Sequence, residues 1–204
     1  MRYGNNEKFE STFGFGLLGT DFTVEGPFKK GYGGSYLVNY RYSTAGIAGD
    51  LGLVDLGGIP NFQDAAFKVL LPTKKAGIFS IFGLSGLSDF VFEDVTPELW
   101  NTPGDASMRA DISEDFKKES YLLTTGINHT INVSENSYLK TSLSYSRDGI
   151  TDEVFELKTI DILNSDGGFL RDSVSSRTLN FNSRLRNSTY QGALTLHSKL
   201  SAKD

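Results

Sequence analysis

Apolar and polar residues alternate with a period of two along several stretches of the chain. In residues 36–43 every second side chain is aromatic or aliphatic, namely Tyr36, Val38, Tyr40 and Tyr42, and the residues between them include Asn39 and Arg41. Successive side chains of an extended strand point to opposite faces, so this pattern predicts a β-strand with one apolar and one polar face. The same alternation recurs in 64–71, 139–145 and 190–200.

The alternation predicts an all-β protein of about seven to eight strands in an antiparallel, up-and-down meander. No stretch keeps the 3.6-residue period of an amphipathic helix. Several predicted strands exceed the usual length of about 5–6 residues. They approach the ~9–11 residues that a transmembrane β-strand needs. The predicted strands are 9–25, 35–46, 62–71, 77–92, 119–131, 138–153 and 177–201, with residues 1–4 as the stub of an earlier strand.

The first predicted strand, 9–25, changes its pattern at Gly19. The phenylalanines before Gly19 stand at odd positions and Phe22 stands at an even one, so in a regular strand they would point to opposite faces. A β-bulge near Gly19 would bring them to the same face. Residues 14–19 also match the dinucleotide-binding pattern G-x-G-x-x-G. That motif requires a helix to follow, whereas the residues after Gly19 continue as a strand, so we expect no nucleotide site.

Short and long connections alternate between the predicted strands. The short ones are 27–34, 72–77 and 132–137, and the long ones are 47–61, 93–118 and 154–176. This order is typical of outer-membrane barrels, which have tight periplasmic turns and extended extracellular loops. Trp100 lies in the second long connection and is a candidate ligand contact.

Composition excludes several functional classes. The 204 residues carry a net charge of −5, which argues against nucleic-acid binding, and contain no cysteine, which removes disulfides and thiolate chemistry. No apolar run approaches the ~18 residues of a spanning helix. Residues 1–10 lack the apolar segment of a signal peptide.

Candidate catalytic chemistry is absent from the sequence. His129 and His197 stand alone in predicted strands, without a metal-ligand partner at motif spacing, and are expected to be structural or wall-lining. Paired carboxylates suit a solvated rim, with Ca²⁺ binding or ligand contact as the alternative; they are Glu93 and Asp94, Glu114 and Asp115, and Asp152 and Glu153. We therefore expect no enzyme and no cofactor, and we assign no metal site. Aromatic residues near the short turns suit an interfacial girdle; they are Phe28, Tyr32, Tyr36 and Tyr138.

Four segments resemble a known family. Residues 17–28 (LLGTDFTVEGPF) and 35–43 (SYLVNYRYS) resemble the first barrel strands of TonB-dependent outer-membrane receptors. Residues 62–67 (FQDAAF) and 71–77 (LPTKKAG) look like the hairpin that follows. The resemblance is strongest over residues 5–85 and afterwards rests on the rhythm of hairpins. It implies a barrel of about 22 strands, a plug inside the barrel and energy supplied through the TonB complex.

The resemblance, applied to this chain, implies one segment of an outer-membrane barrel over residues 1–204, without plug domain or TonB box. The parent protein would import a large nutrient such as a siderophore, cobalamin, glycan or peptide. The expected partners are outer-membrane lipid, the remainder of the barrel and plug, and the TonB complex through the missing plug region. From the alternation, the candidate lumen-facing residues are Asn39, Arg41, Asp64, Lys68, Gln191 and Lys199, whereas Tyr36, Val38, Tyr40, Tyr42, Leu194 and Leu196 should face lipid.

Two other functions fit the same pattern. A small self-contained outer-membrane barrel, acting in adhesion or as a structural protein, would have an even number of strands in a closed sheet. A soluble β-sandwich that serves as a binding module would need a second sheet to cover the apolar face of the first.

Overall fold

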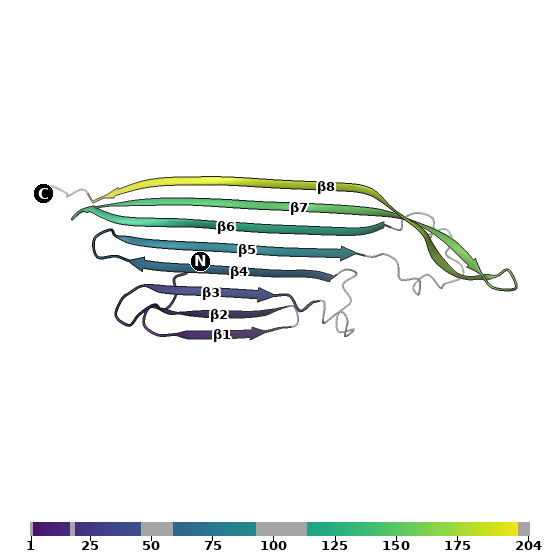
Figure 1. Ribbon diagram of the computed structural model, residues 1–204, viewed down its shortest axis with the longest axis horizontal. Helices are drawn as coiled ribbons and strands as arrows, with labels where there is room; N and C mark the ends of the chain where they lie inside the picture. Colours follow the sequence, from purple (N-terminus) through teal and green to yellow (C-terminus); the bar gives the residue numbers. More distant parts are fainter. Residues whose placement is uncertain (1, 17–18, 46–58, 93–113, 200–204) are drawn as a thin grey trace.

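The computed structural model describes residues 2–16, 19–45, 59–92 and 114–199. These residues form a single antiparallel sheet of eight strands in which each strand pairs with the next along the chain (Figure 1). The strands are β1 (Glu10–Phe15), β2 (Thr20–Pro27), β3 (Ser35–Tyr42), β4 (Ile59–Pro72), β5 (Ile78–Phe92), β6 (Glu114–Ser134), β7 (Ser137–Leu163) and β8 (Phe169–Ser198). The predicted all-β, up-and-down meander is confirmed. Within the described ranges no helix is long and apolar enough to cross a membrane.

The sheet is open. β1 and β8 are its two margins, and each pairs with only one neighbouring strand (Figure 1). The strands lengthen across the sheet, from 6 residues in β1 to 30 residues in β8.

The prediction of one long strand over 9–25 is wrong, because β1 and β2 form a hairpin. Gly16 N donates to Gly19 O at 2.8 Å, and Phe13 of β1 pairs with Phe22 of β2. The chain reverses between these glycines, so residues of opposite parity come to lie on one face without a bulge. Residues 2–4, the described part of the expected strand stub 1–4, form no strand.

The prediction of a long loop over 154–176 is also wrong. β7 and β8 continue through this region as one hairpin that ends in a turn at Asn164–Gly168, where Asn164 Oδ1 accepts hydrogen bonds from two backbone N–H groups. The register of β7 and β8 shifts at three places in this hairpin, so the alternation of side chains is interrupted.

The three short turns join the strands at one end of the sheet, on the left of Figure 1, as the alternation of connections predicts. We call this the short-turn end and the other the long-connection end. The predicted long connection 47–61 lies mostly outside the described residues, and β4 begins at Ile59. Residues 93–113, including Trp100, also lie outside them, and β6 begins at Glu114.

Residues on one face of each strand pair with residues on the same face of the next strand, so each face continues across the sheet. Val38 of β3 pairs with Val24 of β2 and with Phe67 of β4, and the same face continues through β8. We call it the apolar face; its members include Phe22, Tyr36, Val38, Tyr40, Tyr42, Phe67, Ile81, Ile127, Leu143, Tyr190, Leu194 and Leu196. The opposite, polar face includes Glu25, Asn39, Arg41, Asp64, Lys68, Lys140 and Gln191. Within the strands, the register therefore places the alternating apolar and polar residues on opposite faces of the sheet.

The described sheet has no second layer. Its buried apolar side chains are only Leu37, Ala45 and Leu157, whereas Phe15 is 78% exposed, Tyr190 80% and Leu194 69%. Soluble monomers rarely expose a contiguous apolar surface of this extent, so the face requires a covering from outside the sheet.

Glycines in the sheet lie beneath rings from neighbouring strands. Phe67 pairs with Gly83, and a Cβ built at Gly83 would overlap the Phe67 ring. Phe82 covers Gly126 in the same way on the opposite face, and the Tyr121 ring covers Gly149. The missing side chains leave room for the rings to lie flat on the sheet, which shields the backbone of the glycines.

This packing predicts that Gly83→Ala destabilises the protein by about 1–3 kcal/mol, because the new methyl group displaces the Phe67 ring. Gly86→Ala in the same strand is the control, since its Cβ would meet Asp64 Cβ at 3.8 Å and Gln63 O at 4.0 Å, both ordinary contact distances. Gly86→Ala should be neutral or slightly stabilising. Urea unfolding in detergent micelles measures both, and equal stability of the two variants would contradict the role of the ring.

Candidate functional site

Four of the six predicted lumen-facing residues lie together on the polar face of β3 and β4. Arg41 and Asp64 are cross-strand partners, and the Arg41 Nε and Nη2 atoms both lie 2.8 Å from Asp64 Oδ2. The same guanidinium lies over the Phe62 ring, 5.2 Å from its centroid. Asn39 Nδ2 donates to Thr23 Oγ1 at 2.8 Å.

The other two predicted residues lie far from this group. Gln191 belongs to β8, four strands away from β4, although it shares the polar face. Lys199 follows the end of β8, where its backbone N donates to Asn136 O at 2.8 Å. Both side chains are exposed. That these residues face a lumen stays a prediction.

Residues 2–8 form an N-terminal arm that lies across the polar face. The Arg2 guanidinium binds both carboxylate oxygens of Glu25, and Asn5 N donates to Glu25 Oε2 at 2.8 Å. Lys68 Nζ lies 3.8 Å from the centroid of the Tyr3 ring. Glu25 is 6% exposed, so the arm covers the polar side chains of β2 and β4. The sequence analysis missed this arm.

The ion pairs of the arm shift the pKa of its basic groups. The hydrogen bond to Glu25 raises the pKa of Arg2, and the hydrogen bond to Glu10 raises the pKa of Lys8. Both groups therefore stay protonated across the physiological range. The guanidinium supplies the positive charge that the buried Glu25 carboxylate needs.

A second ion pair that the sequence analysis missed lies beyond the sheet's apolar region. Arg177 Nε of β8 donates to Asp115 Oδ2 of β6 at 2.8 Å, and the Arg177 guanidinium lies 3.7 Å from the centroid of the Phe155 ring. Asp115 is buried, unlike the solvated rim expected for the paired carboxylates. This contact joins β6, β7 and β8 where the strands project toward the long-connection end.

Both histidines stack on aromatic partners of the neighbouring strand. The His129 ring lies 4.3 Å from Phe79, and the His197 ring lies 4.5 Å from Tyr138. His129 Nε2 also lies 2.6 Å from Ala76 O in a short turn. Among the described residues no three metal-ligating side chains come close enough to hold an ion. The arrangement agrees with a structural role for the histidines.

Aromatic rings gather near the short turns. Phe28 packs against Tyr36 at 5.4 Å, and the stacked pairs of both histidines lie at the same end of the sheet. Tyr36 and Phe79 point to the apolar face, whereas Tyr138 points to the polar face. The rings therefore mark this end of the sheet on both of its surfaces.

The apolar face has a defined height. It runs without a charged side chain from Phe79 to Leu87 of β5 and from Tyr121 to Ile131 of β6, or nine and eleven residues. At ~3.3 Å per residue these stretches measure about 30–36 Å, and a tilt of ~45° would reduce their height to about 21–26 Å. The apolar band of an outer-membrane barrel is about 25 Å tall.

Charged residues begin on the same face immediately beyond this band, at the long-connection end. Asp89 lies two residues beyond Leu87, and Glu119 two residues beyond Tyr121. Lys117 Nζ lies 2.7 Å from Glu119 Oε1. The border of the band also includes Arg147, Glu153, Arg184 and Arg186.

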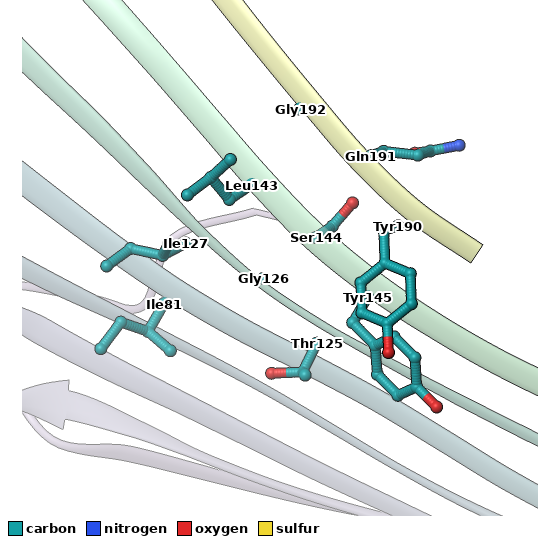
Figure 2. A pocket seen from close by; sticks show the side chains of 10 residues that line it. All are labelled: Ile81, Thr125, Gly126, Ile127, Leu143, Ser144, Tyr145, Tyr190, Gln191 and Gly192. Atoms are coloured by element: carbon teal, nitrogen blue, oxygen red, sulfur yellow. The ribbon is translucent and has the colours of Figure 1, made fainter. Parts of the chain in front are cut away.

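A shallow groove of about 630 Å³ lies within the apolar face (Figure 2). Ile81, Ile127 and Leu143 line it, and Gly192 leaves space beside Leu143. The Tyr145 and Tyr190 rings lie side by side at one end of it, with centroids 4.8 Å apart. Nearly all of its lining is hydrocarbon, so the groove suits an apolar occupant.

Comparison with known proteins adds no relative: no protein-family model, curated protein or solved structure matches this chain.

The arm predicts a specific effect of Arg2→Ala. Without the guanidinium, the Glu25 carboxylate loses its cationic partner, so the arm should dissociate from the polar face more often. Proteinase K should then cleave within residues 2–8 several-fold faster, as measured by mass spectrometry. Lys8→Ala is the control, because its partner Glu10 is much more exposed than Glu25. Equal cleavage of Arg2→Ala and the unmodified protein would show that Glu25 does not hold the arm.

Proposed function

We propose that this chain is part of the wall of a transmembrane β-barrel in an outer membrane. The observation that carries the proposal is the exposed apolar face, one side of a single-layer sheet whose uncharged height matches a hydrocarbon core. Lipid supplies the covering that such a face requires, and antiparallel strands satisfy their backbone groups within the sheet. The polar face then lines the interior.

The described residues argue against a soluble sandwich. A sandwich buries its apolar residues between two sheets, about 10 Å apart. Here one sheet contains all eight strands, and its largest apolar side chains are among the most exposed.

The proposal extends to a TonB-dependent receptor whose parent protein takes up a large nutrient, such as a siderophore, cobalamin, glycan or peptide. Support comes from the resemblance of residues 17–43 and 62–77 to the barrel strands of that family. The three short turns at one end of the sheet agree with it, as does a polar face that binds a segment of polypeptide. In this proposal the protein is a transporter and not an enzyme, and the short turns face the periplasm.

The assignment of the faces is tested by Val38→Arg. Val38 lies on the apolar face, level with Val24 and Phe67, so an arginine there would enter hydrocarbon. We expect Val38→Arg to lower the stability of the protein folded in lipid vesicles by about 2–4 kcal/mol.

Asn39→Arg is the matched control, since the same side chain would point to the polar face. It removes the hydrogen bond to Thr23, a loss of about 1 kcal/mol. Urea titration of the vesicle-bound protein compares the two variants. Equal losses would show that the faces are misassigned.

A self-contained barrel is the second candidate, and the even number of described strands favours it, because the smallest outer-membrane barrels have eight. The strand lengths oppose it. β1 has 6 residues and β8 has 30, so closure of β1 onto β8 would leave most of the β8 edge unpaired.

Amide hydrogen exchange in micelles separates the two candidates. In the open sheet, alternate amides of β8 point away from β7 and have no strand partner, so these amides should exchange much faster than those bonded to β7. Uniform protection along β8, together with protection of the outer amides of β1, would establish closure and reject the open wall.

A further inference from the structure

Three arginines lie together on the apolar-face side of the sheet, at the border of the uncharged band: Arg147 pairs with Leu123 of β6, and across β7 Arg186 is level with Tyr121 and Arg184 with Glu119. Arg147 of β7 pairs with Ser188, and Arg186 of β8 pairs with Gly149, so the two arginines are diagonal neighbours. Such neighbours lie about 7–8 Å apart. Arg184 is two residues farther along β8 on the same face.

In the part of the chain that the structure describes, none of these arginines makes a side-chain hydrogen bond or an ion pair. Glu119 lines the same hollow as Arg184 and Arg186 without forming an ion pair with either. The carboxylates on this side of the sheet have other partners: Glu119 has Lys117, Glu153 has Asn182, and Asp89 has Asn61. The cluster can therefore bind an anion from outside.

The apolar groove lies next to this cluster along the same two strands. On β7 the order is Leu143, Tyr145, Arg147, and on β8 it is Gly192, Tyr190, Arg186. Six residues separate Gly192 from Arg186, about 20 Å along the strand. The Tyr145 and Tyr190 rings, which are apolar with a polar hydroxyl, lie at one end of the groove (Figure 2). Along their strands these tyrosines come between the groove residues Leu143 and Gly192 and the arginines.

We propose that this surface, formed by the groove, Tyr145 and Tyr190, and the three arginines, is a binding site for one anionic phospholipid. The acyl chain lies in the groove and the phosphate headgroup binds Arg147, Arg184 and Arg186. The order of apolar, interfacial and cationic side chains matches that of a lipid whose headgroup points toward the long-connection end. The inference rests on the proposed function, because it places the apolar face in lipid.

The test compares phosphatidylglycerol with phosphatidylcholine of the same acyl chains. The full chain, folded in detergent micelles, is mixed with each lipid, and native mass spectrometry measures the lipid that it retains. The unmodified protein should retain phosphatidylglycerol in preference to phosphatidylcholine. Each basic residue near a membrane surface contributes about 1 kcal/mol toward an anionic lipid, or roughly fivefold.

Arg147→Gln/Arg184→Gln/Arg186→Gln should lower the retention of phosphatidylglycerol at least roughly tenfold, to the level of phosphatidylcholine. The matched control, Lys74→Gln/Lys75→Gln/Lys140→Gln, removes the same charge from a short turn and the polar face and should leave retention unchanged. Gly192→Phe fills the groove beside the flexible Leu143 side chain and should weaken retention of both lipids.

Equal retention of the two lipids by the unmodified protein overturns the proposal, and this comparison requires no variant to fold. Unchanged retention by the arginine variant overturns it too. Displacement of the lipid by excess inorganic phosphate would indicate a bare anion site and reject the lipid. If the chain folds without entering micelles at all, the proposed function fails as well. If it enters micelles without lipid preference, only this inference fails.

Discussion

The structure depends on one constraint, which is that a single-layer sheet cannot bury its own apolar face. Burial of apolar surface contributes roughly 25 cal/mol per Å², the main favourable term in folding. In the described residues only Leu37, Ala45 and Leu157 bury apolar side chains within the chain. The stabilising burial must therefore come from a surface that the sheet contacts, and in the proposed barrel that surface is lipid.

The opposite requirement applies to the polar face, whose charged side chains need water rather than an apolar covering. Arg41 with Asp64, and Arg2 with Glu25, place paired charges where one member stays largely exposed. Charges of this kind are costly in hydrocarbon and tolerable beside water. The two faces cannot exchange roles, so in the proposed barrel the ion pairs determine which face points to lipid as much as the apolar residues do.

Alternation along the chain was sufficient to predict the fold class and both faces, because in an extended strand the odd and even positions point to opposite faces whatever the strand pairs with. It could not distinguish a β-bulge from a reversal of the chain near Gly19, since either one brings odd-numbered and even-numbered residues to the same face. It also missed the outer part of β7 and β8, where three register shifts interrupt the period. The contact of Arg2 with Glu25 joins residues 23 positions apart, and no local pattern selects one partner among several carboxylates. Trp100 lies outside the described residues, so its predicted contact with ligand stays a prediction.

The open edge of β8 leads to a last consequence. An unpaired backbone N–H or C=O group in hydrocarbon costs several kcal/mol, and no water is present there to replace the missing partner. The part of β8 level with the apolar band of β6, from Arg186 to Leu196, presents such groups on its free side. β1 has only 6 residues and would pair with about half of this edge. A sheet whose apolar face lies in lipid therefore requires further strands beside β8 to complete the barrel. That requirement favours the large barrel over the self-contained one, and it rests on the strand edges and the proposed lipid contact, independently of any family resemblance.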